Sequence, residues 1–345
     1  MNRAELVSAL ERLCPSLSTM GLGGTDCFWF KGDEVRAADG MTMACVRLKA
    51  DTGLDCTVPG AKLYGLLSGM SEDEVELAAD DESLRVKTDR VRATYKTRPD
   101  PGMLDELDFD VAEWLPVPKD MLEGLKLCRF AASRGRGISH GAMCGVHVHG
   151  KTVQATDGYR LAWMTCENEL SADPVVIPPE LMAAVLKYPD DVDGWAVKDG
   201  AVYFKFKTAD TVMAGKTLAG SFPDTVELRE NASKLGNTLK FPDGTAAALN
   251  KHIAHLKDVA IDATATVSVG PDGLTLTSSD SLVYTLEETL AMDGGAVEAS
   301  FRIAPNLLKD ILDRTETMHY GDPLKILAFK VGCFNYITTA SVPEK

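Results

Sequence analysis

The 345-residue sequence lacks several features that mark common functional classes. Its eight cysteines include no Cys-x-x-Cys pair, which argues against a zinc ribbon or a disulfide framework, so we expect free and buried thiols. It has no run of about 18 apolar residues, as a transmembrane helix would need. Arg3, Glu5 and Glu11 place charges where a signal peptide would be apolar. We therefore expect a soluble, intracellular protein.

A phosphate-binding or dinucleotide-binding motif is also missing. Gly215-Lys216-Thr217 ends like a phosphate-binding loop, but Asp210 stands where that loop needs glycine. The glycine-rich residues 20–24 lack the strand, turn and helix that surround a dinucleotide fingerprint. The sequence predicts no cofactor.

Histidines offer the best catalytic alternative. His147 and His149 alternate onto one face of a predicted strand, with Cys144 and His140 nearby. Such side chains are zinc ligands, so a metal-dependent hydrolase is one alternative function, although no paired acid stands at a diagnostic spacing. A non-catalytic interaction scaffold is a second alternative.

A threefold internal repeat is the main feature that the sequence does contain. An apolar residue followed by proline precedes a predicted helix three times, at near-equal intervals: Val58-Pro59, Ile177-Pro178 and Ala304-Pro305. Proline suits the first turn of a helix, where its missing N–H group costs nothing. Repeats of this length indicate three similar domains.

Each repeat combines two helices with alternating strands, which makes the fold class α+β. An amphipathic helix opens each unit, at residues 2–13, 119–136 and 245–260. Hairpins are predicted before the Pro-initiated helix, at 27–48, 146–164 and 266–290, and after it, at 83–97, 201–218 and 324–340. The expected order is helix, two strands, helix, two strands, with extra strands at the joins.

The repeats predict three domains: residues 1–115, 116–232 and 233–345. The second and third also have a strand before the first helix, at 113–118 and 238–242, which the first domain lacks.

Residues 155–162 read Ala-Thr-Asp-Gly-Tyr-Arg-Leu-Ala. Together with the repeat, this segment resembles the signature of bacterial sliding clamps, the DNA polymerase III beta subunit family. The resemblance implies three clamp domains, each with two inward-facing helices and outer antiparallel sheets, that assemble into a ring. It implies a non-catalytic protein that encircles double-stranded DNA and tethers the replicative polymerase. The expected location is the cytoplasm of a bacterium, or of an infected bacterium if a virus encodes the chain.

The resemblance also implies a cleft between domains 2 and 3 for short peptide motifs of the polymerase and the clamp loader. Its residues here are Thr156, Gly158, Tyr159, Arg160, Leu161, Pro223, Leu228, Ile337 and Thr339. Tyr159 stands where the family commonly has histidine, and Thr339 where it usually has an apolar residue, which predicts an unusual partner motif. A head-to-tail homodimer would meet at Met103 and Leu104 of one chain and at Val259 and Ile261 of the other.

Charge is segregated along the chain. The net charge is −15, but the six repeat helices together are mildly positive. A ring with these helices inside would hold a basic bore within an acidic shell, which suits nonspecific phosphate contacts. The predicted DNA-facing residues are Lys62, Lys126, Arg129, Arg134, Arg136, Lys251, Lys257 and Lys309.

Overall fold

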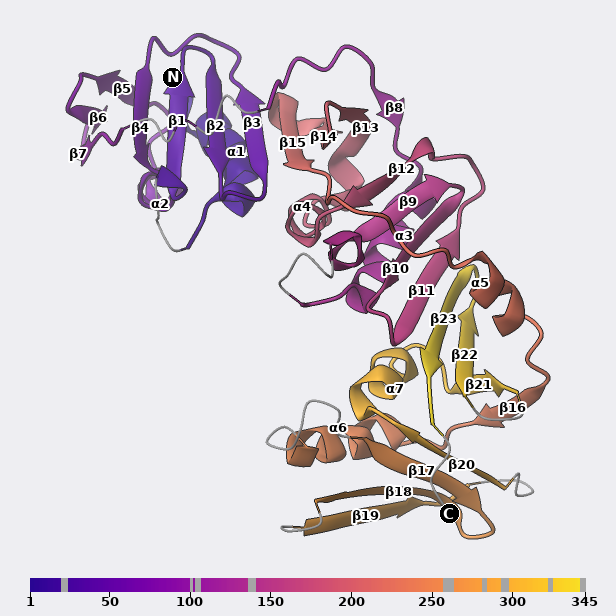
Figure 1. Cartoon of the computed structure of the whole chain (residues 1–345). Coiled ribbons are helices and arrows are strands. Elements are labelled where there is room, and N and C mark those ends of the chain that lie inside the picture. The colour runs from indigo at the N-terminus through magenta and orange to yellow at the C-terminus, as the bar shows by residue number, and fades with distance from the viewer. Residues whose placement is uncertain are drawn as a thin grey trace. The chain divides into compact units, whose positions relative to one another are not determined.

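The computed structural model describes residues 1–19, 24–99, 102, 107–135, 141–256, 264–280, 284–292, 298–321 and 325–341 (Figure 1). The chain divides into two compact units, one with residues 1–122 and 175–219 and the other with residues 123–174 and 220–345. Among the described residues, no helix is long and apolar enough to span a membrane.

Unit 1 is built on an eight-stranded antiparallel sheet of order β4-β1-β2-β3-β15-β14-β13-β8. Its strands are β1 Cys27–Lys31, β2 Glu34–Ala38, β3 Met43–Arg47, β4 Asp55–Pro59, β8 Leu115–Pro116, β13 Val192–Lys198, β14 Ala201–Phe206 and β15 Thr211–Lys216. The two halves join where β3 pairs with β15, which sets Cys45 opposite Val212 and Met43 opposite Ala214.

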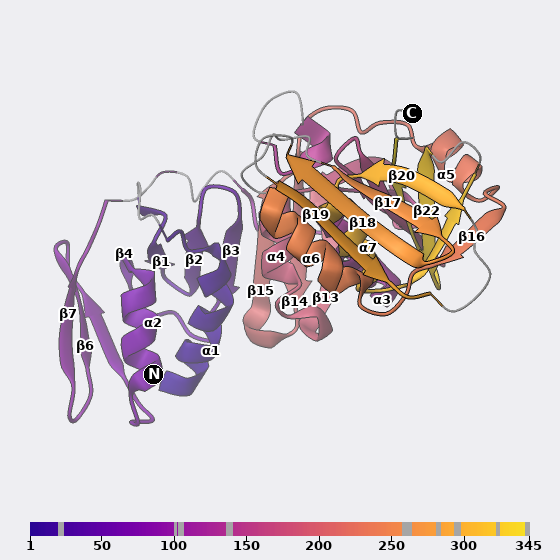
Figure 2. The same cartoon turned by 90° about the horizontal axis from the view of Figure 1, so that it is seen from below.

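Two helices, α1 Arg3–Leu13 and α2 Gly60–Gly69, lie side by side on the first half of this sheet (Figure 2). In α1, Asn2 caps the helix by accepting from the Glu5 N–H group at 3.0 Å, and Leu6, Leu10 and Leu13 bury one face. Unit 1 also holds α4 Pro179–Val185 and a three-stranded sheet of β5 Glu76–Ala79, β6 Ser83–Lys87 and β7 Arg92–Lys96.

The other face of the same sheet is covered by residues 107–114. Successive strand residues point to opposite faces, so Phe28 and Phe30 face the helices while Trp29 faces away from them. Leu107 and Phe109 pack with Trp29 in one buried cluster, which also contains Met43, Cys45 and Tyr203. The segment that leads from β7 to β8 therefore closes this face of the sheet.

Unit 2 contains a second eight-stranded antiparallel sheet of order β12-β9-β10-β11-β23-β22-β21-β16. Its strands are β9 Val146–Gly150, β10 Thr152–Thr156, β11 Arg160–Thr165, β12 Ser171–Ile177, β16 Asn237–Lys240, β21 Thr317–Tyr320, β22 Ile326–Val331 and β23 Phe334–Thr339. Here β11 pairs with β23, so that Leu161 lies opposite Ile337 and Trp163 opposite Asn335.

A four-stranded sheet of order β19-β18-β17-β20 completes unit 2. Its strands are β17 Ala265–Gly270, β18 Gly273–Asp280, β19 Tyr284–Leu290 and β20 Ala299–Ile303. Helices α6 Thr245–Leu256 and α7 Pro305–Leu312 pack against each other, α5 Val226–Ala232 contacts β22, and α3 spans Lys119–Cys128.

The repeat is confirmed, and each unit has more strands than the two predicted pairs with extra strands at the joins. Each repeat has a helix, four strands, a second helix and three strands, because the predicted hairpins contain or adjoin third strands and β4, β12 and β20 lead into the Pro-initiated helices. The helix predicted over 119–136 ends at Cys128 and continues only as a 3₁₀ turn over Arg129–Ala131.

The strands predicted before the first helices of repeats two and three are confirmed as β8 and β16. In the first repeat, Asn2 instead forms a single antiparallel bridge with Glu74 beside β5. The cysteines are unpaired as expected, and most are buried, but Cys333 is exposed because it lies in the tight turn between β22 and β23. The domain limits at 115 and 232 stay a prediction.

Candidate functional site

The Thr-Asp-Gly-Tyr-Arg segment forms the tight turn between β10 and β11. Asp157 accepts hydrogen bonds from the backbone N–H groups of Tyr159 (3.0 Å) and Arg160 (3.1 Å). Gly158 has a φ of +90°, which favours glycine, and its N–H group donates to Thr156 Oγ1 at 3.1 Å. The Thr156 hydroxyl donates to the Arg160 carbonyl. Thr156, Asp157 and Gly158 thus stabilise the turn, and the turn fixes where Tyr159 and Leu161 lie.

Arg160 is a buried anchor. Its guanidinium makes ion pairs with Asp157 (2.9 Å) and with Asp310 of α7 (2.6 Å), and it lies over the ring of Phe130. A buried and fully paired arginine positions the turn against α7, since removing one partner of such a pair typically costs about 3–5 kcal/mol. Arg160 therefore supports the candidate cleft by holding the β10–β11 turn in place.

The apolar floor of the candidate cleft lies at the β11–β23 join. Leu161 and Ile337 face each other there and are only 1% and 3% exposed. They share a buried cluster with Trp163, Ala232 and Ala328. Both side chains are therefore core residues of unit 2 as well as candidate cleft residues.

Five of the predicted cleft residues are exposed: Gly158, Tyr159, Pro223, Leu228 and Thr339. Tyr159 is 63% exposed and Leu228 is 38% exposed, so both side chains offer apolar surface to a partner. Thr339 is held next to Tyr159, whose carbonyl accepts hydrogen bonds from the Thr339 N–H group (2.9 Å) and hydroxyl (3.2 Å). The remaining predicted residue, Thr156, is buried.

The segment that carries Pro223 and Leu228 is fixed by a buried polar network. Thr225 donates to Gln154 Oε1 at 2.7 Å, and Gln154 Nε2 lies 3.1 Å from His147 Nδ1. Because the amide oxygen of Gln154 accepts from Thr225, its nitrogen donates to His147, which must be neutral. Phe222 stacks on the His147 ring with centroids 4.5 Å apart. No local pattern in the sequence indicates this role of His147, because Gln154 and Thr225 come from separate elements.

The contacts of His147 also test the alternative of a metal-dependent hydrolase. His147 is buried and engaged with Gln154, whereas His149 is exposed. In the part of the chain that the structure describes, no group of three or more His, Cys, Asp or Glu side chains could hold a metal ion, and His140 lies outside that part. Nothing among the described residues favours the hydrolase.

Burial makes the network sensitive to acid. Desolvation, with smaller contributions from His149 and Arg229, lowers the pKa of His147 from 6.5 to about 4. The unfolded chain then binds the proton more readily, so stability should fall as the pH drops from about 6.5 to about 4, by about 3 kcal/mol in total. Urea midpoints measured between pH 7.5 and 4.5 should show a flatter profile for His147→Gln than for the wild type. Identical profiles would contradict a buried, neutral His147.

A cavity of about 270 Å³ lies beside the candidate cleft floor in unit 2. Trp163, Arg229, Ala232, Leu235, His319 and Lys330 are among its lining residues. Arg229 Nη1 donates to Thr152 Oγ1 at 3.3 Å, while its buried Nε has no hydrogen-bond partner among the described residues. Burial lowers the pKa of Arg229. No local pattern in the sequence indicates this cavity, because residues of α5, β11, β21 and β22 line it together.

The predicted DNA-facing residues fall into two groups. Lys62, Lys126, Arg129 and Arg134 are exposed, and none has a carboxylate partner among the described residues. Lys251 instead pairs with Glu288 at 2.7 Å, and Lys309 with Asp313 at 2.9 Å. The others, Arg136 and Lys257, lie outside the described residues, as do the predicted dimer residues Met103, Leu104, Val259 and Ile261.

No protein-family model and no curated protein matches the sequence. Solved structures do match it along its whole length. It is similar to the beta subunit of the DNA polymerase of Streptococcus pyogenes, at 15% identity and a TM-score of 0.78, with 99% of both chains covered.

Two further structures show the same similarity. The Caulobacter crescentus pol III beta protein is 18% identical with a TM-score of 0.78, covering 99% of this chain and 98% of that one. The DNA polymerase III beta subunit of Thermotoga maritima is 15% identical with a TM-score of 0.75, covering 100% and 99%. The chain therefore has the fold of the bacterial DNA polymerase III beta subunit from end to end.

Proposed function

We propose that this protein is a sliding clamp, a non-catalytic ring that encircles double-stranded DNA and holds a replicative polymerase on it. The shared fold supports this, and so does the tripled pattern of helices and sheets. We place it in the cytoplasm of a bacterial or virus-infected bacterial cell, with the polymerase and its clamp loader as partners.

The unpaired sheet edges are the observation that carries the proposal. Within the chain, the third strand of one repeat pairs with the last strand of the next, as β3 with β15 and β11 with β23. The two strands left over by this pattern are β19 and β7, and both lie at sheet edges. Two chains joined head to tail by β19 of one and β7 of the other would close a ring of six repeats.

Side chains on the two edge strands suit this pairing. Both strands alternate between exposed and half-buried residues. Arg92 and Lys96 are exposed on β7, and Glu287 is exposed on β19. Opposite charges on neighbouring strands are favourable, so the edges are complementary. A homodimer is therefore part of the proposal.

Retention on DNA tests encirclement. The wild type should slide off linear DNA but stay on closed circular DNA, because topology and not affinity holds a ring in place. Sparse phosphate contacts leave binding nonspecific and salt-dependent, which sliding requires. Equal dissociation from both DNA forms would exclude a ring.

Replacing Lys126, Arg129 and Arg134 together by alanine should weaken DNA loading most at low salt. Removing one phosphate-binding side chain should flatten the salt dependence by roughly one unit. The comparison variant is Lys251→Ala with Lys309→Ala, because Glu288 and Asp313 hold those two ammonium groups in ion pairs and make them less available to phosphate. An unchanged salt series for the triple variant would place the three side chains away from DNA.

The partner cleft is the second part of the proposal. Its floor would be Leu161 and Ile337, and its exposed walls would be Tyr159, Leu228 and Thr339. An apolar hollow with few polar anchors suits a short peptide. The His147–Gln154–Thr225 network would keep the wall that contains Leu228 in place.

A further inference from the structure

We propose that the cavity beside the cleft floor in unit 2 binds a carboxylate of the partner peptide, so that the peptide carries an acidic residue next to its apolar ones. This inference rests on the proposed partner cleft. It assigns a charged subsite to Arg229 and Lys330, which line the cavity.

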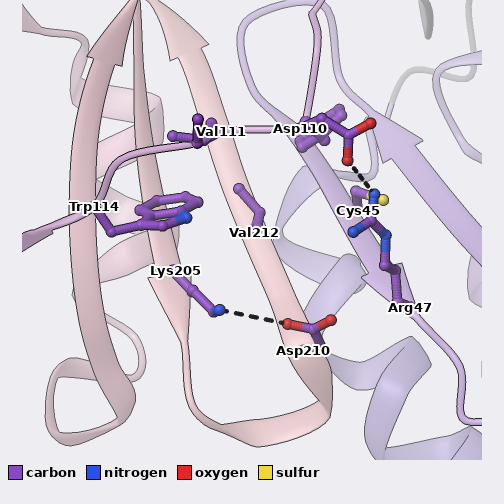
Figure 3. Close-up of a pocket in the computed structure, with 10 residues that line it drawn as sticks. Cys45, Arg47, Asp110, Val111, Trp114, Lys205, Asp210 and Val212 are labelled. Carbon is purple, nitrogen blue, oxygen red and sulfur yellow. Dashed lines mark hydrogen bonds and ion pairs between the residues drawn. The ribbon is translucent and has the colours of Figure 1, made fainter.

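Strand register shows that unit 1 contains an equivalent cavity. In unit 2, Lys330 of β22 lies opposite Asn335 of β23, which lies opposite Trp163 of β11. The corresponding row in unit 1 consists of Lys205, Val212 and Cys45. Those three residues line a cavity of about 320 Å³ (Figure 3). The two cavities therefore occupy the same place in two sheets built to one pattern.

The chain itself supplies the acidic groups of the unit 1 cavity. Asp110 lies in the segment that covers the sheet, and its carboxylate pairs with Arg47 at 2.5 Å. Asp210 lies 3.9 Å from the ammonium group of Lys205 (Figure 3). Phe109 packs into the buried cluster on this face, with Val111 against it. An acidic residue flanked by two apolar ones thus lines this cavity from within the chain, with its carboxylate paired to Arg47.

The unit 2 cavity is lined by the cations Arg229 and Lys330, and its described lining contains no Asp or Glu. Neither Arg229 nor Lys330 has a carboxylate within ion-pair distance among the described residues, and the buried Nε of Arg229 lacks any hydrogen-bond partner there. Asp224 and Glu230 attract Arg229 only from farther away. A partly desolvated cation without a counter-ion favours an incoming anion.

The cavity and the candidate cleft floor share residues. Trp163, Ala232 and Ala328 line the cavity and also belong to the cluster that contains Leu161 and Ile337. Arg229 directly follows Leu228, the exposed residue of the cleft wall. A peptide whose apolar side chain lies on the floor would therefore bring a neighbouring carboxylate to Arg229 and Lys330. Such a peptide would have the same order of residue types as Phe109-Asp110-Val111 in unit 1, an acid between apolar residues.

Selection from a phage-displayed library of random decapeptides against the full-length protein tests the inference. Selected peptides that bind the wild type but not the Leu228→Asp variant are those that bind in the cleft. We expect these peptides to contain an Asp or Glu beside apolar residues. Their affinity should fall about tenfold in the Arg229→Gln/Lys330→Gln variant. A peptide with that acid changed to Asn or Gln should bind the wild type and the double variant equally.

Lys205→Gln is the matched control, because it removes the equivalent cation of unit 1, and it should leave peptide affinity unchanged. Lys330→Gln alone changes an exposed side chain and keeps the test valid if the double variant is unstable. Cleft peptides without an acidic residue, or equal affinity in the Lys330 variant, would overturn the carboxylate site and leave the cleft standing. Peptides indifferent to Leu228→Asp would overturn both.

Discussion

Thr94→Pro should convert the dimer into a monomer and abolish retention on closed circular DNA. The Thr97 N–H group donates to the Glu82 carbonyl, and the Thr88 N–H group donates to the Val91 carbonyl. The backbone groups of every second residue of β7 therefore face β6. The N–H group of Thr94 therefore points to the free edge. Proline removes that donor without breaking the β6–β7 pairs, and edge strands tolerate it.

Light scattering at micromolar concentration should give about twice 37.2 kDa for the wild type and 37.2 kDa for Thr94→Pro. Retention of the variant on closed circular DNA should drop to the level seen on linear DNA. Thr94→Ala keeps the N–H group and should remain a dimer. A dimeric proline variant would show that β7 lies outside the interface.

Leu161→Asp should unfold unit 2 or destabilise it by about 4 kcal/mol or more. Its side chain is 1% exposed and faces Ile337 across the β11–β23 join, so the new carboxylate would be buried without a partner. Thermal unfolding followed by circular dichroism measures the destabilisation. A variant as stable as the wild type would mean that Leu161 is more accessible than its packing indicates.

Leu228→Asp is the contrasting change. Leu228 is 38% exposed, so the charge stays in water and stability should change by less than about 1 kcal/mol. The variant should still form a dimer and thread onto DNA, yet fail to stimulate its polymerase. Normal processive synthesis would place the partner elsewhere.

The sequence revealed the repeat because its signals are local. Proline at a helix start and alternating apolar residues act within a few positions, so α1, α2, α4 and α7 were found near their observed limits. Strands β3 and β11 lack this signal because their burial does not alternate; in β3, Met43 to Val46 are all buried.

The site depended on contacts that no local pattern encodes. Arg160 is buried because Asp310 neutralises it from α7, and Leu161 is buried because α5 and β23 pack over it. The cavity cations Arg229 and Lys330 are about a hundred residues apart. The charge of a helix does not show its ion pairs either, and Lys251 of α6 pairs with Glu288 of β19.

The join between β3 and β15 has a consequence for folding during synthesis. Strand β3 leaves the ribosome with its backbone edge unpaired, and its partner follows only when the chain reaches Thr211. The same holds for β11, which waits for Phe334 to begin β23. An open edge invites wrong pairing, and here β7 is made before either correct partner. The nascent chain must therefore avoid wrong strand pairing within its first two repeats. A truncated chain without the third repeat would leave the edge of β11 unpaired and prone to aggregation.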